Sequence, residues 1–228
     1  MPLQNSSEMP LTAASEMPLP KCFYNGATAQ ELLLKSNYNN VKQRRTTLNA
    51  WHDINADRIK PYDFLSIIEI EKGSKKKYEL DKETGLLILD RILYTSTHYP
   101  ANYGFIPKTY ADDNDPLDVL VLCSEPIEPL VLVRCYPIGV ISMVDNQMSD
   151  DKIIAIPFQD PTYNSYRSIE ALPNHIFTEM QHFFKVYKEL EHKKTAVHEV
   201  RGQSDAIEII SKAIEQYKVT FPDDAEKV

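Results

Sequence analysis

The strongest constraint on the fold is a series of short, strand-like segments separated by tight, polar turns. The predicted strands span residues 64–70, 77–80, 86–91, 118–122, 131–144 and 152–156. The first three are expected to be consecutive antiparallel strands, because Gly-containing turns separate them. Five or six strands with short connections favour a closed or partly closed barrel, so the expected fold class is α+β and mainly β.

The last third of the chain has helical periodicity instead. Apolar residues recur at three- and four-residue steps over 176–190, which predicts a helix packed on the barrel with Tyr187 near its end. A second helix is predicted from Ser204, as N-cap, to Tyr217. Two carboxyl-terminal helices should therefore flank the barrel.

Length and charge limit the classes of partner. A chain of 228 residues with 43% hydrophobic residues can bury one substantial core, so we expect one domain over 51–220 and a short tail over 221–228. The net charge of −8 argues against nucleic acid or an anionic membrane as the main partner. No apolar run approaches the roughly 20 residues that span a bilayer.

The first fifty residues differ in composition from the rest. Met-Pro-Leu recurs at Met1, Met9 and Met17, and residues 1–50 are predicted to be a low-complexity, disordered arm. The arm lacks the pattern of a secretory or transit peptide, so the default location is the cytoplasm. The basic run at 42–45 keeps an organelle open as an alternative.

The three cysteines, Cys22, Cys123 and Cys135, are too few and too scattered for a disulfide framework or a zinc site. They suit a reducing compartment, and the last two are expected to be small core residues. The six histidines show no metal-ligand spacing.

Four carboxylates lie within 112–118, and a second acidic group, Asp145, Asp150 and Asp151, follows about thirty residues later. Carboxylates this close repel one another, and a hard cation such as Mg²⁺ that takes oxygen ligands would relieve the repulsion. A solvated acidic loop is the alternative reading. An EF-hand loop fails on spacing, because Asp118 occupies the position that needs glycine.

A second set of residues could hold an anion. Lys77, Arg91 and Lys152 lie in or beside predicted strands, where they could face the acidic loop or remain surface charges. Lysine offers a point charge and arginine a fork, so together they could bind a phosphate-bearing tetra-anion beside bound metal. Tyr99 and Tyr103 could donate to phosphate or pack as core aromatics, and the sequence leaves both open.

Taken together, these motifs resemble the soluble family I inorganic pyrophosphatases, and the eukaryotic, plant-like branch fits best. The resemblance runs from about Trp51 to Tyr217. The family signature of an Asp, one residue, Asp-Pro, an apolar residue and Asp matches 113–118 in full, and the remaining motifs follow in the family's order. The family's fold is a five-stranded barrel of the OB type with flanking helices, in agreement with the strand pattern.

The resemblance also implies roles for individual residues. It makes Asp115 the general base, with Tyr99 a further catalytic residue sometimes assigned as a proton donor. The implied metal ligands for Mg²⁺ are Asp113, Asp118, Asp145, Asp150 and Glu69. The implied phosphate-binding residues are Lys77, Arg91, Tyr103, Lys152, Tyr187 and Lys188. The expected reaction is Mg²⁺-dependent hydrolysis of pyrophosphate to two orthophosphates by a metal-activated water.

The chain departs from the family in places. Asn146 stands where bacterial members often carry an acid, and the loop 128–130 lacks a glycine that is common in relatives. Two other function classes stay open: a phosphohydrolase acting on another phosphoanhydride, and a catalytically altered metal-binding relative. The oligomeric state is also open, with a homo-oligomer as one alternative.

Overall fold

The computed structural model describes residues 48–145, 148–193 and 195–225, so the predicted arm lies outside the described residues except for 48–50. The strands are β1 (Ile59–Lys60), β2 (Asp63–Ile70), β3 (Lys76–Leu80), β4 (Leu87–Ile92), β5 (Asn102–Phe105), β6 (Asp118–Val121), β7 (Leu132–Asp145), β8 (Met148–Ser149), β9 (Lys152–Pro157) and β10 (Thr195–Gly202). The helices are η1 (Ala56–Arg58), η2 (Ile169–Ala171), α2 (Asn174–Val186), η3 (Glu189–Glu191), α3 (Gln203–Thr220) and α4 (Pro222–Ala225).

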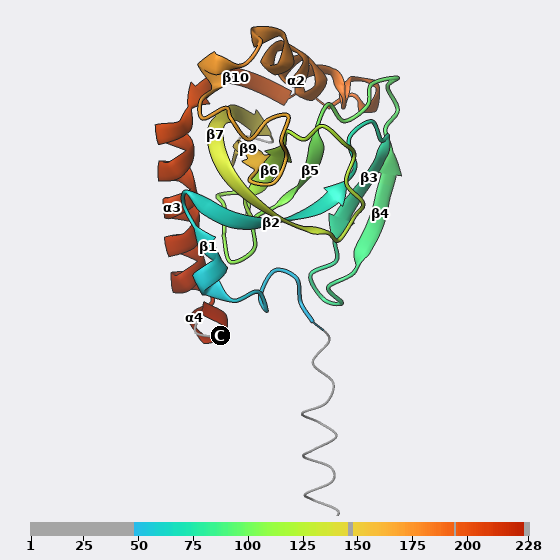
Figure 1. Cartoon of the computed structure of the whole chain (residues 1–228). Helices are drawn as coiled ribbons and strands as arrows, with labels where there is room; N and C mark the ends of the chain where they lie inside the picture. Colours follow the sequence, from blue (N-terminus) through green and yellow to red (C-terminus); the bar gives the residue numbers. More distant parts are fainter. Residues whose placement is uncertain (1–47, 146–147, 194, 226–228) are drawn as a thin grey trace, which may run out of the picture. The chain divides into compact units, whose positions relative to one another are not determined.

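Five strands close into a ring, which confirms the predicted barrel (Figure 1). In order around the ring, β2 pairs with β5, β5 with β6, β6 with β9, β9 with β7, and β7 again with β2. The short strands β1 and β8 and the longer β10 extend the sheet from β2 and β7. Closure leaves the ring strands paired on both sides, which is how a small barrel avoids unpaired edges.

The central strands are buried on both faces. Along β6, Val119 and Val121 belong to one apolar cluster, while Leu120 and Leu122 belong to another. The first cluster includes residues of α3 and the second includes residues of α2. Two covered faces explain why the sequence here is a continuous apolar run and not an alternating one.

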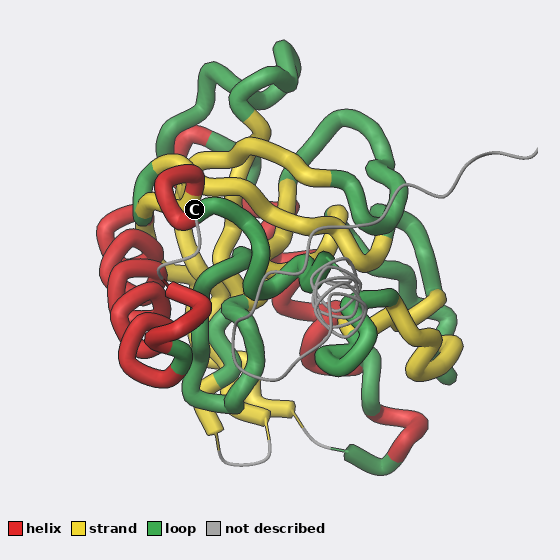
Figure 2. Tube along the Cα trace, turned by 90° about the horizontal axis from the view of Figure 1, so that it is seen from below, coloured by secondary structure: helices red, strands yellow, loops and turns green. Residues whose placement is uncertain are grey.

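Both carboxyl-terminal helices pack on the barrel, as predicted, and lie outside the strands in the views of Figures 1 and 2. The predicted extent of α2 was too long, because the helix ends at Val186 and Leu190 lies in a 3-10 turn, largely exposed. The predicted N-cap of α3 was also wrong. Gly202 takes that position, and Ser204 lies inside the helix. Among the described residues, no helix combines the length and apolar character that a bilayer crossing requires.

The hairpin β3–β4 corrects the prediction of three consecutive antiparallel strands. In the described part of the chain, β3 pairs with β4 alone, while β2 pairs with β5 and β7. The hairpin stands beside the barrel in Figure 1, and because it lies outside the ring, Ile88, Leu89 and Ile92 of β4 remain about half exposed. Four strands were not predicted: the two-residue β1 and β8 and the longer β5 and β10. Gly104 in β5 fits because a Cβ there would come within 1.8 Å of the Ile67 carbonyl oxygen of β2.

The pair β6–β9 is the parallel one in a ring that is otherwise antiparallel. Its register places Asp118 directly opposite Lys152, at the start of both strands. Because side chains at matched positions point to the same face, an acid and a base separated by more than thirty residues in sequence become neighbours.

Candidate active site

A cavity of about 300 Å³ opens between the barrel, the hairpin β3–β4 and the acidic loop. Ten of the thirteen predicted site residues line it: Glu69, Lys77, Tyr103, Asp113, Asp115, Asp118, Asp150, Lys152, Tyr187 and Lys188. The other lining residues are Tyr78, Glu79, Leu80, Lys82, Phe105 and Pro116. The lining therefore holds six carboxylates and four lysines, a composition suited to cations and phosphate together.

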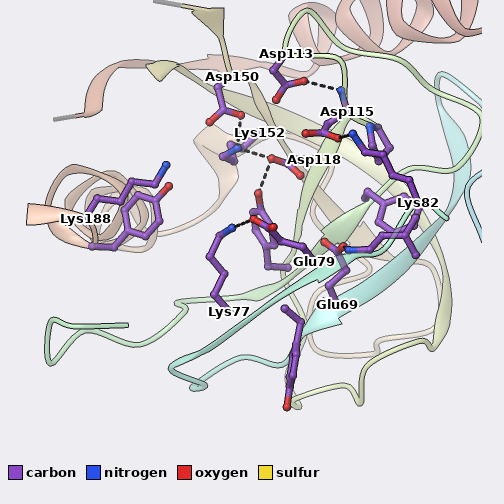
Figure 3. A pocket seen from close by; sticks show the side chains of 16 residues that line it. Glu69, Lys77, Glu79, Lys82, Asp113, Asp115, Asp118, Asp150, Lys152 and Lys188 are labelled. Carbon is purple, nitrogen blue, oxygen red and sulfur yellow. Dashed lines mark hydrogen bonds and ion pairs between the residues drawn. The ribbon is translucent and has the colours of Figure 1, made fainter. Parts of the chain in front are cut away.

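Lys152 lies in the middle of the barrel wall of the cavity and is only 2% exposed. Its ammonium lies between the carboxylates of Asp118 and Asp150, as Figure 3 shows, and its Nζ is 2.5 Å from Asp150 Oδ1. Burial lowers the pKa of Lys152, but Asp118 and Asp150 outweigh this effect and raise it well above its usual range. Lys152 therefore remains charged.

Asp118 also accepts a hydrogen bond from the Tyr103 hydroxyl at 2.5 Å. Burial and the neighbouring Asp150 raise the pKa of Asp118, although Lys152 opposes them. Burial, followed by the charge of Asp118, raises the pKa of Tyr103 well above its usual range, so the phenol stays neutral and keeps its proton to donate.

Two further acids of the cavity, Asp113 and Glu69, have raised pKa values. Burial and the charge of Asp118 raise the pKa of Asp113 to about 6, and the same two causes raise the pKa of Glu69 to about 8. Glu69 accepts a hydrogen bond from the Leu80 amide at 2.9 Å, which ties it to the end of β3. Burial is the larger cause of both shifts and the charge of Asp118 adds to it, so the ionised forms of Asp113 and Glu69 are disfavoured in the folded protein.

The hairpin supplies the opposite wall. Lys77 forms ion pairs with Glu79 and with Asp90, the latter at 3.1 Å. Arg91 is the cross-strand partner of Lys77, and its Nε donates to Glu191 Oε1 at 2.8 Å. Among the described residues, Arg91 Nη2 is the one buried side-chain nitrogen or oxygen atom with no hydrogen-bond partner. A buried guanidinium donor without a partner would be stabilised by an added anionic acceptor.

The acidic loop leads from β5 into β6. Asp113 Oδ1 accepts the Asp115 amide at 3.1 Å, which folds the loop back on itself. Asp115 is half exposed and forms an ion pair with Lys82 (Figure 3). The carboxyl-terminal end of α2 completes the cavity with Tyr187, the C-cap residue of α2, and Lys188.

Three predicted residues lie elsewhere or cannot be placed in the cavity. Tyr99 is 2% exposed and packs behind the lining, with its ring 5.4 Å from that of Tyr103 and 4.8 Å from that of Phe183. Arg91 is not among the lining residues. Asp145 ends β7 opposite Met148 and Thr195, but its side chain lies outside the described part of the chain.

Glu79 and Lys82 line the cavity without having been predicted as site residues. Glu79 could have been found, because alternation along β3 puts it on the same side as Lys77. Lys82 lies in the turn after β3, and no local pattern marks it.

The cavity does not contain a ready-made metal cage. In the described ranges, no three acidic, histidine or cysteine side chains are already arranged to hold one ion. The donor set nevertheless fits a hard cation, because the lining carboxylates outnumber the lysines and the pKa values of Asp113 and Glu69 are raised.

Known proteins that are similar to this chain point to one family. A family model described as inorganic pyrophosphatase matches residues 66–218. The chain belongs to the inorganic pyrophosphatase family. It is 45% identical over 175 residues to soluble inorganic pyrophosphatase 2 of Chlamydomonas reinhardtii, covering 77% of this chain and 91% of the relative. It is 44% identical over 177 residues to soluble inorganic pyrophosphatase 1 of Arabidopsis thaliana, covering 78% and 84%.

The fold agrees as well. The crystal structure of inorganic pyrophosphatase from Thermus thermophilus matches with a TM-score of 0.71 at 35% sequence identity, covering 75% of this chain and 99% of that one. The predicted family and fold class are confirmed, and the algal and plant relatives are consistent with the plant-like branch. As a member of this family, the protein is an inorganic diphosphatase, a hydrolase that converts pyrophosphate into two orthophosphates.

Proposed function

We propose that pyrophosphate is hydrolysed in this cavity, with Mg²⁺ as the metal and Asp115 as the general base. The observation that carries the proposal is the crowding of carboxylates around Asp118, which leaves the cavity short of positive charge. Divalent cations and the lysines would together balance these carboxylates and the tetra-anionic substrate.

The residues that would hold Mg²⁺ are Asp113, Asp118, Asp145 and Asp150, with Glu69 as a more distant carboxylate. When bound, Mg²⁺ would supply electrostatic stabilisation of phosphate oxygens and a water of lowered pKa. The raised pKa values of Asp113 and Glu69 support this assignment, because a nearby cation would restore their ionised forms.

Asp115 would accept the proton of the attacking water. It lines the cavity and is half exposed, so it can reach a water molecule at the mouth. The amide of Asp115 is held by Asp113, so the base would be fixed relative to a metal ligand.

The substrate-binding residues would be Lys77, Arg91, Tyr103, Lys152, Tyr187 and Lys188. The orphaned Arg91 Nη2 supports a phosphate contact, because one added acceptor would satisfy it. Lys77 now pairs with Glu79 and Asp90, and phosphate oxygens would compete for the same ammonium. The role of Tyr99 as proton donor stays a prediction, and its packing supports a part in orienting Tyr103.

We also propose a reducing compartment, with the cytoplasm as the default. The free thiols of Cys123 and the fully buried Cys135 support this assignment.

The test is phosphate release by the full chain from pyrophosphate, tripolyphosphate and ATP, each with Mg²⁺, Ca²⁺ or EDTA. Rapid release from pyrophosphate with Mg²⁺, lost in EDTA, is the expected result. Preference for ATP or tripolyphosphate would indicate the alternative phosphohydrolase. Binding of Mg²⁺ and pyrophosphate without release would indicate the catalytically altered relative.

A further inference from the structure

Lys82 is the one lysine of the cavity to which the proposed mechanism gives no task. It lies in the turn between β3 and β4, and its side chain is 50% exposed. Its Nζ forms an ion pair with Asp115 and donates to the carbonyl oxygen of Asn114 at 3.3 Å. One ammonium therefore joins the hairpin to two consecutive residues of the acidic loop. Figure 3 shows its ion pair with Asp115.

The residue that Lys82 contacts in the loop is held in an unusual backbone conformation. Asn114 has a φ of 69°, in the left-handed region that few residues other than glycine adopt. Its amide donates to the Ala111 carbonyl at 3.1 Å, and its side-chain Oδ1 accepts from the Tyr110 hydroxyl at 2.7 Å. The bond from Lys82 engages the remaining carbonyl, so contacts from both sides fix the turn just before Asp115.

Trp51 provides a platform for Lys82. The Lys82 ammonium lies 5.6 Å from the centre of the Trp51 ring, within cation–π range. Trp51 is 3% exposed, and its Nε1 donates to the Thr109 carbonyl at 2.8 Å, so the ring cannot turn away without losing that bond. The same ring stacks on Tyr110 at 6.2 Å, which links it to Asn114.

The other end of the loop is anchored independently. Asp112 accepts from Lys212 Nζ at 3.1 Å and from Gln216 Nε2 at 3.2 Å, both on α3. The beginning of the loop is therefore fixed to a helix. The Asp115 backbone is held by its amide on Asp113 Oδ1 at 3.1 Å and by its carbonyl on the Ala111 amide at 2.8 Å, while the Asp115 carboxylate pairs with Lys82.

We propose that Lys82, seated on Trp51, is a positioning residue that holds Asp115 at the mouth of the cavity. The inference rests on the proposed role of Asp115 as general base. Exposed ion pairs add little to stability, so the effect of Lys82 would be on geometry. Small displacements of a reacting group are costly to rate, which makes such a contact important for turnover.

The experiment compares Lys82→Met, Lys82→Arg and the control Lys218→Met, which removes an exposed lysine of α3 paired with Glu215. We expect Lys82→Met to lower kcat by roughly tenfold to a hundredfold with KM little changed. Lys82→Arg should restore most of the rate, because its guanidinium can still reach a carboxylate and a carbonyl. Lys218→Met should behave like the wild type.

A double-mutant cycle separates positioning from a general structural effect. If Lys82 acts through Asp115, then Lys82→Met should cause no further loss of kcat when added to Asp115→Asn. Trp51 is the sole tryptophan of the chain, so its fluorescence reports the contact directly. Its emission should change in Lys82→Met and stay unchanged in Lys218→Met.

Three results would overturn the inference while leaving the proposed function intact. The first is that kcat and KM of Lys82→Met are both unchanged. The second is that Lys82→Met has a raised KM with a normal kcat. The third is that the losses of kcat in Lys82→Met and Asp115→Asn are fully additive. The second would make Lys82 a substrate-binding residue. An Asp115→Asn variant with normal turnover would instead remove the proposed base, whatever Lys82 does.

Discussion

The two walls of the cavity differ in how far their charged side chains are exposed to solvent. The barrel wall presents Asp118 and Lys152 from paired strands, and the Lys152 side chain is only 3% exposed. On the opposite side, the ion pair of Lys82 with Asp115 is about half exposed. Buried charges are strongly coupled and shift one another's pKa, whereas exposed pairs exchange partners at little cost. The barrel wall, here called the fixed wall, is held by largely buried charges, whereas the hairpin wall contacts Asp115 through an exposed ion pair.

Removing a carboxylate from the fixed wall should have the largest effect. We expect Asp118→Asn to lower kcat by about a hundredfold or more, because a charge that stabilises the transition state would be missing. The fold should persist, since asparagine keeps the shape and an acceptor for Tyr103. Steady-state assays with circular dichroism would check both points, and near-normal turnover would show that Asp118 is not a metal ligand.

The next test compares how much a lysine from each wall contributes to the free energy of unfolding. Lys152→Met would leave the partly buried carboxylates of Asp118 and Asp150 without their cation, so we expect the free energy of unfolding to fall by about 3 kcal/mol. Lys82→Met removes an exposed pair and should change it by less than about 1 kcal/mol. Urea unfolding in EDTA measures both, and equal losses would mean that the walls do not differ in this way.

The pH dependence of the metal-free protein gives a third test. Burial, together with Asp118, raises the pKa of Glu69 from 4.5 to about 8 in the folded state. Below pH 4.5 both states bind the proton, and between 4.5 and 8 the folded state alone keeps it. The stability that the folded protein gains by keeping the Glu69 proton is therefore lost progressively as pH rises towards 8.

The matched variant for that test is Glu69→Gln, which cannot ionise and keeps an acceptor for the Leu80 amide. It should flatten the fall in stability between pH 5 and 8, as measured by urea unfolding in EDTA. An unchanged slope would assign the pH dependence to other groups, such as Asp113, whose pKa is also raised.

The smallest expected effect lies at the edge of the barrel. Leu130, in the loop between β6 and β7, adopts a φ of 68° and donates its amide to the Ile68 carbonyl at 2.7 Å. Leu130→Gly should raise the free energy of unfolding by up to about 1 kcal/mol, because relief of left-handed strain exceeds the entropy cost of glycine. Leu130→Ala keeps the Cβ and should show no such gain. Equal stabilisation by both would locate the cause in the leucine side chain.

The sequence predicted the barrel well because its strands are apolar and its turns polar. It failed for β5 and β10, since Asn102, Gly104 and the charged residues of β10 break the strand pattern, and tertiary pairing decides their conformation. Motif matching indicated the cluster around Asp118. It did not reveal Lys82, whose contact with Asp115 depends on how the hairpin folds over a loop some thirty residues away.

The parallel register of Asp118 with Lys152 has a consequence for how the protein folds. Hairpin neighbours can meet early, but β6 and β9 are joined by the whole of residues 122–151, so their contact closes a long loop at a substantial entropy cost. The acid and the base of the fixed wall therefore come together only when this long-range pair forms. Recovery of activity during refolding should not precede the pairing of β6 with β9, and chains that have formed only their hairpins should be inert.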